Sequence, residues 1–326
     1  MDAETKTKTT TIHSSRQFLS ALIADGRPLL SLTGVALVMA GGFAIFLSAT
    51  GAFLPQDTEF LGMQVRDLCK IGECRTVHFM FHDRVSFGGV VIAIGTLYLW
   101  LTEFPLKEGC AWAWWTFLVS GIAGFLSFLA YLGYGYLDTW HGAATLMLLP
   151  VFTLGMWFSF SLLKGDRSPR SLLNELKKPS LKTKNDFGWL MIVFTGAGMI
   201  AAGLTIMTVG MTSVFVPEDL IYLKASAAQI AAINPHLIPL IAHDRAGFGG
   251  GLVCVGIMVA LIALHAKPSP HLWQALIFAG TTGFICAIFI HFCIGYLVPV
   301  HLGPAVVGLI VFLTGMILIY PECHAA

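Results

Sequence analysis

Eight long apolar stretches constrain this chain more strongly than any other feature of its sequence. A helix needs about 20 apolar residues to cross the hydrocarbon core of a bilayer. The stretches that meet this length are 29–53, 79–102, 112–134, 139–163, 187–213, 239–264, 272–294 and 298–320. Only 11% of the residues are charged, whereas soluble domains carry roughly 25%. The sequence therefore predicts an all-α integral membrane protein with eight transmembrane helices that face membrane lipid.

Basic residues between the apolar stretches predict the orientation. The segment 164–186 carries seven Lys or Arg residues against three acidic ones, and the N-terminal segment 1–28 contains four more basic residues. Because Lys and Arg concentrate on the cytoplasmic side, we expect both termini in the cytoplasm, at what we take to be a bacterial plasma membrane. The net charge of +1 gives no basic excess that would favour nucleic acid.

The outer side then holds the remaining connections. They are 54–78, 135–138, 214–238 and 295–297. In the two longer ones we expect short helices that lie over the membrane surface. Asp57 and Asp219 each follow a proline by two residues, a spacing that suits a turn or a helix N-cap.

The sequence also contains an internal repeat. The segment FHDRVSFGGVVIAIG at 81–95 is answered by AHDRAGFGGGLVCVG at 242–256. Almost the same spacing separates three further pairs, namely Pro55-Gln56-Asp57 and Pro217-Glu218-Asp219, Gly135-Tyr136 and Gly295-Tyr296, and His141 and His301. We interpret this as a duplication that produces two tandem parallel four-helix bundles, related by a pseudo-twofold axis along the membrane normal. The expected organisation is an N-terminal segment at 1–28, repeats at 29–163 and 187–320, a cytoplasmic linker at 164–186 and a tail at 321–326.

Each predicted repeat places two histidines near the outer face. His82 and His243 begin His-Asp-Arg triads at the outer ends of the second and sixth spans. His141 and His301 lie at the outer ends of the fourth and eighth. Ionisable residues within membrane spans are costly and commonly functional. Because two imidazoles that face each other across a helix bundle can supply both axial ligands of a haem, the pattern predicts these four histidines as ligands of haem iron.

The residues that follow the two triad histidines have two interpretations. Arg84 and Arg245 could pair with the propionates of a haem, or with their neighbours Asp83 and Asp244. The two aspartates would then support the ligands from behind. In the alternative interpretation, each triad is a self-satisfied polar cluster that pins a helix end and anchors the loop before it.

Two other histidines are weaker candidates. His78 precedes His82 by one helical turn and could be an alternative ligand or a supporting partner, although a solvated loop histidine is the simpler interpretation. His291 could face the same pocket as His301, although a single histidine in an apolar helix is more often a core group with satisfied hydrogen bonds.

Cys69 and Cys74 lie in the first outer loop. The outer side of the membrane permits disulfides, and four intervening residues are enough to close a small ring. We expect a disulfide here, with two free thiols as the alternative.

With these residues in place, the layout resembles the haem A synthase family. The resemblance covers nearly the whole chain and implies eight spans in two four-helix halves, with a cysteine pair in the first outer loop that Cys69 and Cys74 would match. It implies that one half holds a substrate haem and the other a haem cofactor. His82 and His243 would take the second-helix ligand positions, and His141 and His301 the fourth-helix positions.

The residues leave three functions open. The first is a haem-binding redox protein, either a haem-modifying enzyme or an electron carrier whose partner is a quinone or another membrane redox protein. The second is a proton-coupled transporter in which the triads form the coupling site. The third is a non-catalytic subunit or assembly factor of a larger membrane complex. Whether the chain is an enzyme stays open at this point.

Overall fold

The computed structural model describes residues 23, 25–129, 136, 139–174, 176 and 181–325, and within these ranges the chain is helical and contains no strand. The helices are α2 (Arg27–Ala49), α3 (Pro55–Leu61), α4 (Val65–Cys69), α5 (Arg75–Leu101), α6 (Ala111–Leu129), α7 (Thr139–Ser159), α8 (Ser171–Asn174), α9 (Lys184–Met211), α10 (Pro217–Leu223), α11 (Ala227–Ile233), α12 (Leu237–His265), α13 (Pro270–Ile294) and α14 (Pro299–Cys323). A π-helical segment, Thr102–Leu106, continues α5.

Seven of these helices are long and apolar enough to cross a membrane, namely α2, α5, α7, α9, α12, α13 and α14. Large apolar side chains on their outer faces, such as Met39 of α2 and Ile317 of α14, are exposed. Such a surface is stable against lipid and not against water. The protein is therefore a multi-pass integral membrane protein. The eighth expected span, 112–134, begins in α6 and continues beyond the described residues, so its crossing of the membrane stays a prediction.

Helices α5 and α12 form the centre of the molecule. Both are buried along most of their length, whereas the other long helices expose most of theirs. Helix α2 packs against α5, and α9 packs against α12. The packing is close because glycines face each other: a Cβ added to Gly88 would lie 2.8 Å from the carbonyl oxygen of Gly41, and one added to Gly249 would lie 2.7 Å from that of Gly203. Small residues of this kind let two membrane helices approach closely.

The two halves of the chain interleave. Helix α13 packs against α5, and α6 packs against α12, so each central helix is covered by a helix from the other half. Glycines again make room, because a Cβ on Gly89 would collide with Cys286 of α13 and one on Gly250 with Ser127 of α6. The two separate four-helix bundles expected from the sequence are therefore not what the structure shows.

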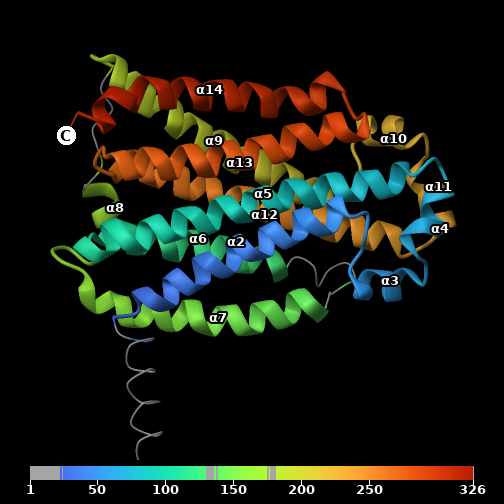
Figure 1. Ribbon diagram of the computed structural model, residues 1–326, viewed down its shortest axis with the longest axis horizontal. Helices are drawn as coiled ribbons and strands as arrows, with labels where there is room; N and C mark the ends of the chain where they lie inside the picture. The colour runs from blue at the N-terminus through green and yellow to red at the C-terminus, as the bar shows by residue number, and fades with distance from the viewer. Residues whose placement is uncertain are drawn as a thin grey trace, which may run out of the picture.

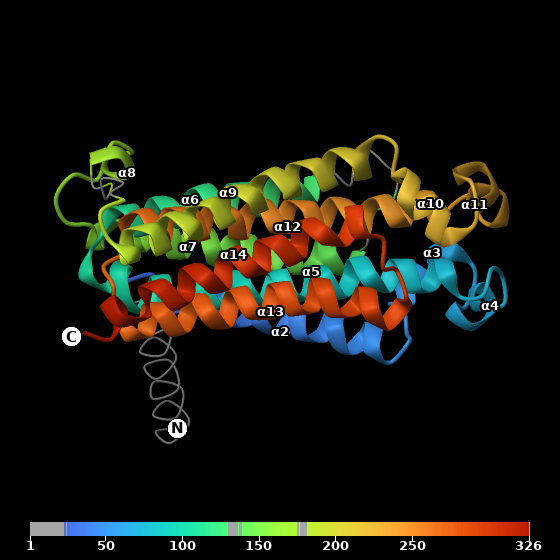
Figure 2. The ribbon, with the colours of Figure 1, turned by 90° about the horizontal axis from the view of Figure 1, so that it is seen from above.

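The short helices α3, α4, α10 and α11 gather at one end of the molecule, while α8 and the C-terminus lie at the opposite end (Figures 1 and 2). All four come from the segments 54–78 and 214–238, where the sequence predicted short surface helices. We call this the capped end. Both His-Asp-Arg triads lie in the first three turns of α5 and α12, directly beneath it.

Candidate metal centre

Arg84 joins the two halves of the protein at the capped end. Its Nη1 donates to Oδ2 of Asp57 at 2.6 Å, and its Nε donates to Oδ2 of Asp244 at 2.8 Å. The hydroxyl of Tyr136 donates to the other oxygen of Asp57 at 2.5 Å. Asp57 stands in the first turn of α3, where its carboxylate also accepts the backbone N–H of Leu54. One buried carboxylate thus links α3, α5 and Tyr136.

Arg245 makes the corresponding contacts from α12. Its Nη1 donates to Oδ2 of Asp219 at 2.8 Å, and its Nε lies 3.5 Å from Oδ2 of Asp83. Tyr296 donates its hydroxyl to Oδ1 of Asp219 at 2.7 Å. Burial raises the pKa of Tyr296, and its hydrogen bond to Asp219 raises it further. The hydroxyl therefore stays protonated and remains a donor at physiological pH.

The arginines therefore pair across the halves, and neither is printed with the aspartate beside it in sequence as its ion-pair partner. The expected pairing of Arg84 with Asp83 and of Arg245 with Asp244 is wrong, because each arginine reaches the aspartate of the other triad. A direct neighbour on a helix points about 100° away, whereas α5 and α12 stand side by side. The propionate role expected for the arginines stays untested, since aspartates already occupy their donors.

Sequence reasoning missed the second partner of each arginine. Asp57 and Asp219 were interpreted as turn or N-cap residues, and both do accept a backbone N–H at the start of a short helix. Both are also almost completely buried, at 2% and 0% exposure, as acceptors of an arginine and a tyrosine. Their recurrence at matching positions, together with Tyr136 and Tyr296, was the signal that could have revealed this role.

Three histidines meet below Asp219. The ring centroids of His82 and His291 are 4.5 Å apart, those of His291 and His301 are 5.2 Å apart, and those of His82 and His301 are 5.7 Å apart. Their nearest ring nitrogens all lie within 4.8 Å of one another. Among the described residues this is the group of histidine, cysteine and acidic side chains with a spacing that suits a metal ion. We call it the histidine cluster.

Hydrogen bonds orient two of these rings. Nδ1 of His82 lies 3.2 Å from the carbonyl oxygen of Phe79, and Nδ1 of His291 lies 2.6 Å from that of Ala287. Only a protonated nitrogen can donate to a carbonyl, so Nε2 carries the lone pair in each neutral ring. Metal-binding histidines are commonly held in this way. Nε2 of His291 is buried and has no hydrogen-bond partner within the protein.

Carboxylates stand behind the other side of the cluster. Oδ1 of Asp83 lies 3.3 Å from Nδ1 of His82, and Oδ1 of Asp219 lies 4.0 Å from Nδ1 of His301. The ion-pair network that contains them has two arginines and four aspartates, which leaves a formal net charge of −2 when all six are ionised. Excess negative charge in an apolar region is costly unless a cation offsets it. A divalent ion held by three neutral imidazoles would supply that charge.

The pairing of histidines differs from the expectation. The sequence paired His82 with His141 and His243 with His301, whereas the structure places His301 of the second half beside His82 of the first. The interleaving of the halves explains this, because α13 and α14 bring His291 and His301 to α5. The backbone of His141 lies in α7, but its side chain is outside the described part of the chain. His243 is buried, with its ring 5.1 Å from that of Tyr136, and His78 is half-buried one turn before His82.

A haem does not fit between His82 and His301 in this arrangement. The porphyrin plane would pass midway between two axial imidazoles and extend several ångströms in every direction around the iron. The ring of His291 lies 4.5 Å from one of these imidazoles and 5.2 Å from the other, so it stands in that plane. The three rings suit a single ion and not a macrocycle.

No family model, curated protein or solved structure matches this chain. The resemblance to the haem A synthase family is therefore an expectation without support from a match. The function has to be argued from the site itself.

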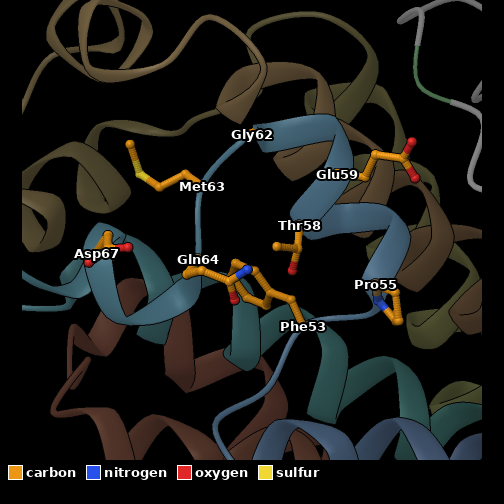
Figure 3. A pocket seen from close by; sticks show the side chains of 8 residues that line it. All are labelled: Phe53, Pro55, Thr58, Glu59, Gly62, Met63, Gln64 and Asp67. Carbon is orange, nitrogen blue, oxygen red and sulfur yellow. The ribbon is translucent and has the colours of Figure 1, made fainter.

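Two further features complete the capped end. A disulfide joins Cys69, at the end of α4, to Cys74, the residue before α5. A surface pocket of about 890 Å³ opens between α3 and α4, and Figure 3 shows the side chains around it. Its lining residues are Phe53, Pro55, Thr58, Glu59, Gly62, Met63, Gln64 and Asp67. None of them belongs to the histidine cluster, so the pocket and the cluster are separate features.

Proposed function

We propose that this integral membrane protein is a metalloprotein that holds a redox-active transition-metal ion, iron or copper, through His82, His291 and His301. The observation that carries the proposal is the Nε2 atom of His291, which is buried without a hydrogen-bond partner and belongs to a ring that faces two other imidazoles. An unsatisfied buried lone pair is costly, and coordination of a metal ion would satisfy it. Imidazole ligands suit iron and copper as well as zinc.

The surroundings of the cluster support a redox role. Three histidines leave coordination positions open, as catalytic and redox sites require and closed structural sites do not. The carboxylates of Asp83 and Asp219 lie close to the ligands and would stabilise the higher charge of an oxidised ion. We therefore assign the protein to membrane redox chemistry.

Haem ligation is the second candidate, at His243 and His141. It is favoured by the burial of His243 on α12, at the position in the second triad that corresponds to His82. A haem there would be a separate cofactor from the ion in the histidine cluster.

We also propose that both termini lie in the cytoplasm of a bacterial cell, and that the two halves arose by duplication. The orientation is supported by the position of α8, which belongs to the basic segment 164–186, at the end opposite the capped end (Figure 1). The duplication is supported by the matched contacts of Arg84 and Arg245 with Asp57 and Asp219.

Metal analysis of the purified protein tests the proposal. We expect about one equivalent of iron or copper per chain, and a loss of at least tenfold in metal affinity in His291→Ala. The matched control is His324→Ala, which removes an exposed histidine near the C-terminus and should leave the metal content unchanged. Thermal unfolding of the metal-free proteins, followed by titration with Cu²⁺, separates lost binding from lost folding, because a ligand at 100 times its Kd stabilises a folded protein by about 2.7 kcal/mol.

The possible outcomes distinguish the candidates. A wild-type protein without bound metal and without a response to Cu²⁺ or Fe²⁺ would overturn the proposal. A Soret band, with haem confirmed as the pyridine haemochrome and lost in His243→Ala, would favour the second candidate. Equal metal content in the wild type and His291→Ala would place the ion elsewhere.

A further inference from the structure

The histidine cluster is closed on most sides and open on one. The side chains of His82 and His291 are almost fully buried, whereas that of His301 is 22% exposed. His301 stands at the start of α14, on the flank between the helix face that packs into the protein and the face that points outward. A molecule that exchanges electrons with the proposed ion would therefore approach it at His301.

The surface around this opening is apolar. Phe292, Leu297 and Val300 are 57%, 50% and 74% exposed, and a side chain at Gly303 would meet no other atom within 4 Å. The segment 292–307 contains no Asp, Glu, Lys or Arg. By contrast, the segment 56–75 of the cap contains seven such residues. The opening at His301 thus faces the lipid, while the charged cap separates the cluster from water.

We propose, on the basis of the function proposed above, that the reductant of this centre is a lipid-soluble hydroquinone that reaches His301 from the bilayer. Three requirements select this class of molecule. The molecule must be soluble in the membrane because the opening is apolar, and it must donate electrons one at a time to a metal ion. It must also release protons near a base, and the carboxylate of Asp219 lies 4.0 Å from the His301 ring.

The electron balance is simple. One hydroquinone releases two electrons and two protons and becomes a quinone. Because each centre holds one ion that accepts one electron, one hydroquinone reduces two ions, such as two Cu²⁺ to two Cu⁺, in two protein molecules. The two protons leave to water at the capped end. The ring of the hydroquinone lies against the exposed edge of the His301 imidazole, which connects it with the ion.

Two valines on the outer face of α14 allow a matched test. Val300 is 74% exposed beside His301, and Val307 is 60% exposed seven residues later on the same face. Val300→Trp fills the space at the opening, while Val307→Trp adds the same bulk to the lipid-facing surface two turns away. Both changes replace an exposed residue, so neither disturbs the packed core.

The measurement is the loss of the Cu²⁺ electron paramagnetic resonance signal after mixing Cu²⁺-loaded protein with decylubiquinol in lipid nanodiscs. We expect Val300→Trp to slow this reduction at least tenfold without changing the bound copper, and Val307→Trp to match the wild type. Equal rates in all three proteins, or no reduction of the wild type by decylubiquinol, would overturn the inference and leave the metal centre intact. Failure of the wild type to bind copper would overturn the metal centre itself, and with it this inference.

Discussion

Arg84 and Arg245 hold corresponding positions in the two triads, but only Arg245 reaches carboxylates beside the histidine cluster. It contacts Asp83 and Asp219, which lie 3.3 Å from Nδ1 of His82 and 4.0 Å from Nδ1 of His301. Arg84 contacts Asp57 and Asp244 instead. Carboxylates behind metal-binding histidines orient the rings and tune the ion. Arg245 is therefore a positioning residue for the proposed centre, and Arg84 is its internal control.

We predict that Arg245→Lys weakens Cu²⁺ binding about tenfold, the lower end of the range for partners behind metal ligands. Lysine keeps the charge but cannot hold two carboxylates in a fixed fork geometry, so the change reports orientation and not net charge. Arg84→Lys should lower the thermal stability to a similar extent and leave the affinity within about twofold of the wild type. Isothermal titration with Cu²⁺ measures the difference, and equal losses in both variants would contradict the assignment.

At the scale of helices, glycine decides which elements touch. Gly88 faces Gly41 between α5 and α2, while Gly42, next in sequence on α2, has no atom within 4 Å of an added Cβ. The two glycines of α2 therefore differ in function although they are neighbours. Gly41 belongs to a helix contact, and Gly42 faces outward.

We predict that Gly88→Ala destabilises the protein by about 1–3 kcal/mol, the usual cost of overpacking a tight contact. The added Cβ would lie 2.8 Å from backbone and side-chain atoms of α2, which cannot move away without separating the helices. Gly42→Ala should leave the stability unchanged or raise it by up to about 1 kcal/mol, because alanine is the better helix former. Thermal unfolding in detergent checks both, and a matching decrease for Gly42→Ala would refute this account.

Over the whole molecule, the interleaving of the halves makes each dependent on the other. The central helices α5 and α12 are each covered by a helix of the opposite half, and four ion-pair contacts of Arg84 and Arg245 include one across the halves for each arginine. A half without its partner would expose buried polar groups and helix faces that are shaped for contact, which is costly in lipid.

We therefore predict that the chain divided in the segment 164–186 and expressed as two separate pieces yields a stable protein only when both are made together. An affinity tag on the second piece should recover the first in a one-to-one complex after detergent extraction. Each piece expressed alone should aggregate or be degraded. Stable, monodisperse single halves would show that the repeats fold as independent bundles, as the sequence first suggested.

The sequence by itself determined the membrane class, the helical content, the short surface helices and the residue types that gather at the capped end. These follow from local properties, namely the lengths of apolar runs and the spacing of the repeated triads. The tertiary structure decided which residues meet. His291 joins the cluster, and His301 crosses to His82, because glycines at 89 and 250 admit a helix from the other half. Pairing across the halves depends on the packing of helices that are distant in sequence, and a repeat pattern carries no information on whether its copies stand apart or interleave.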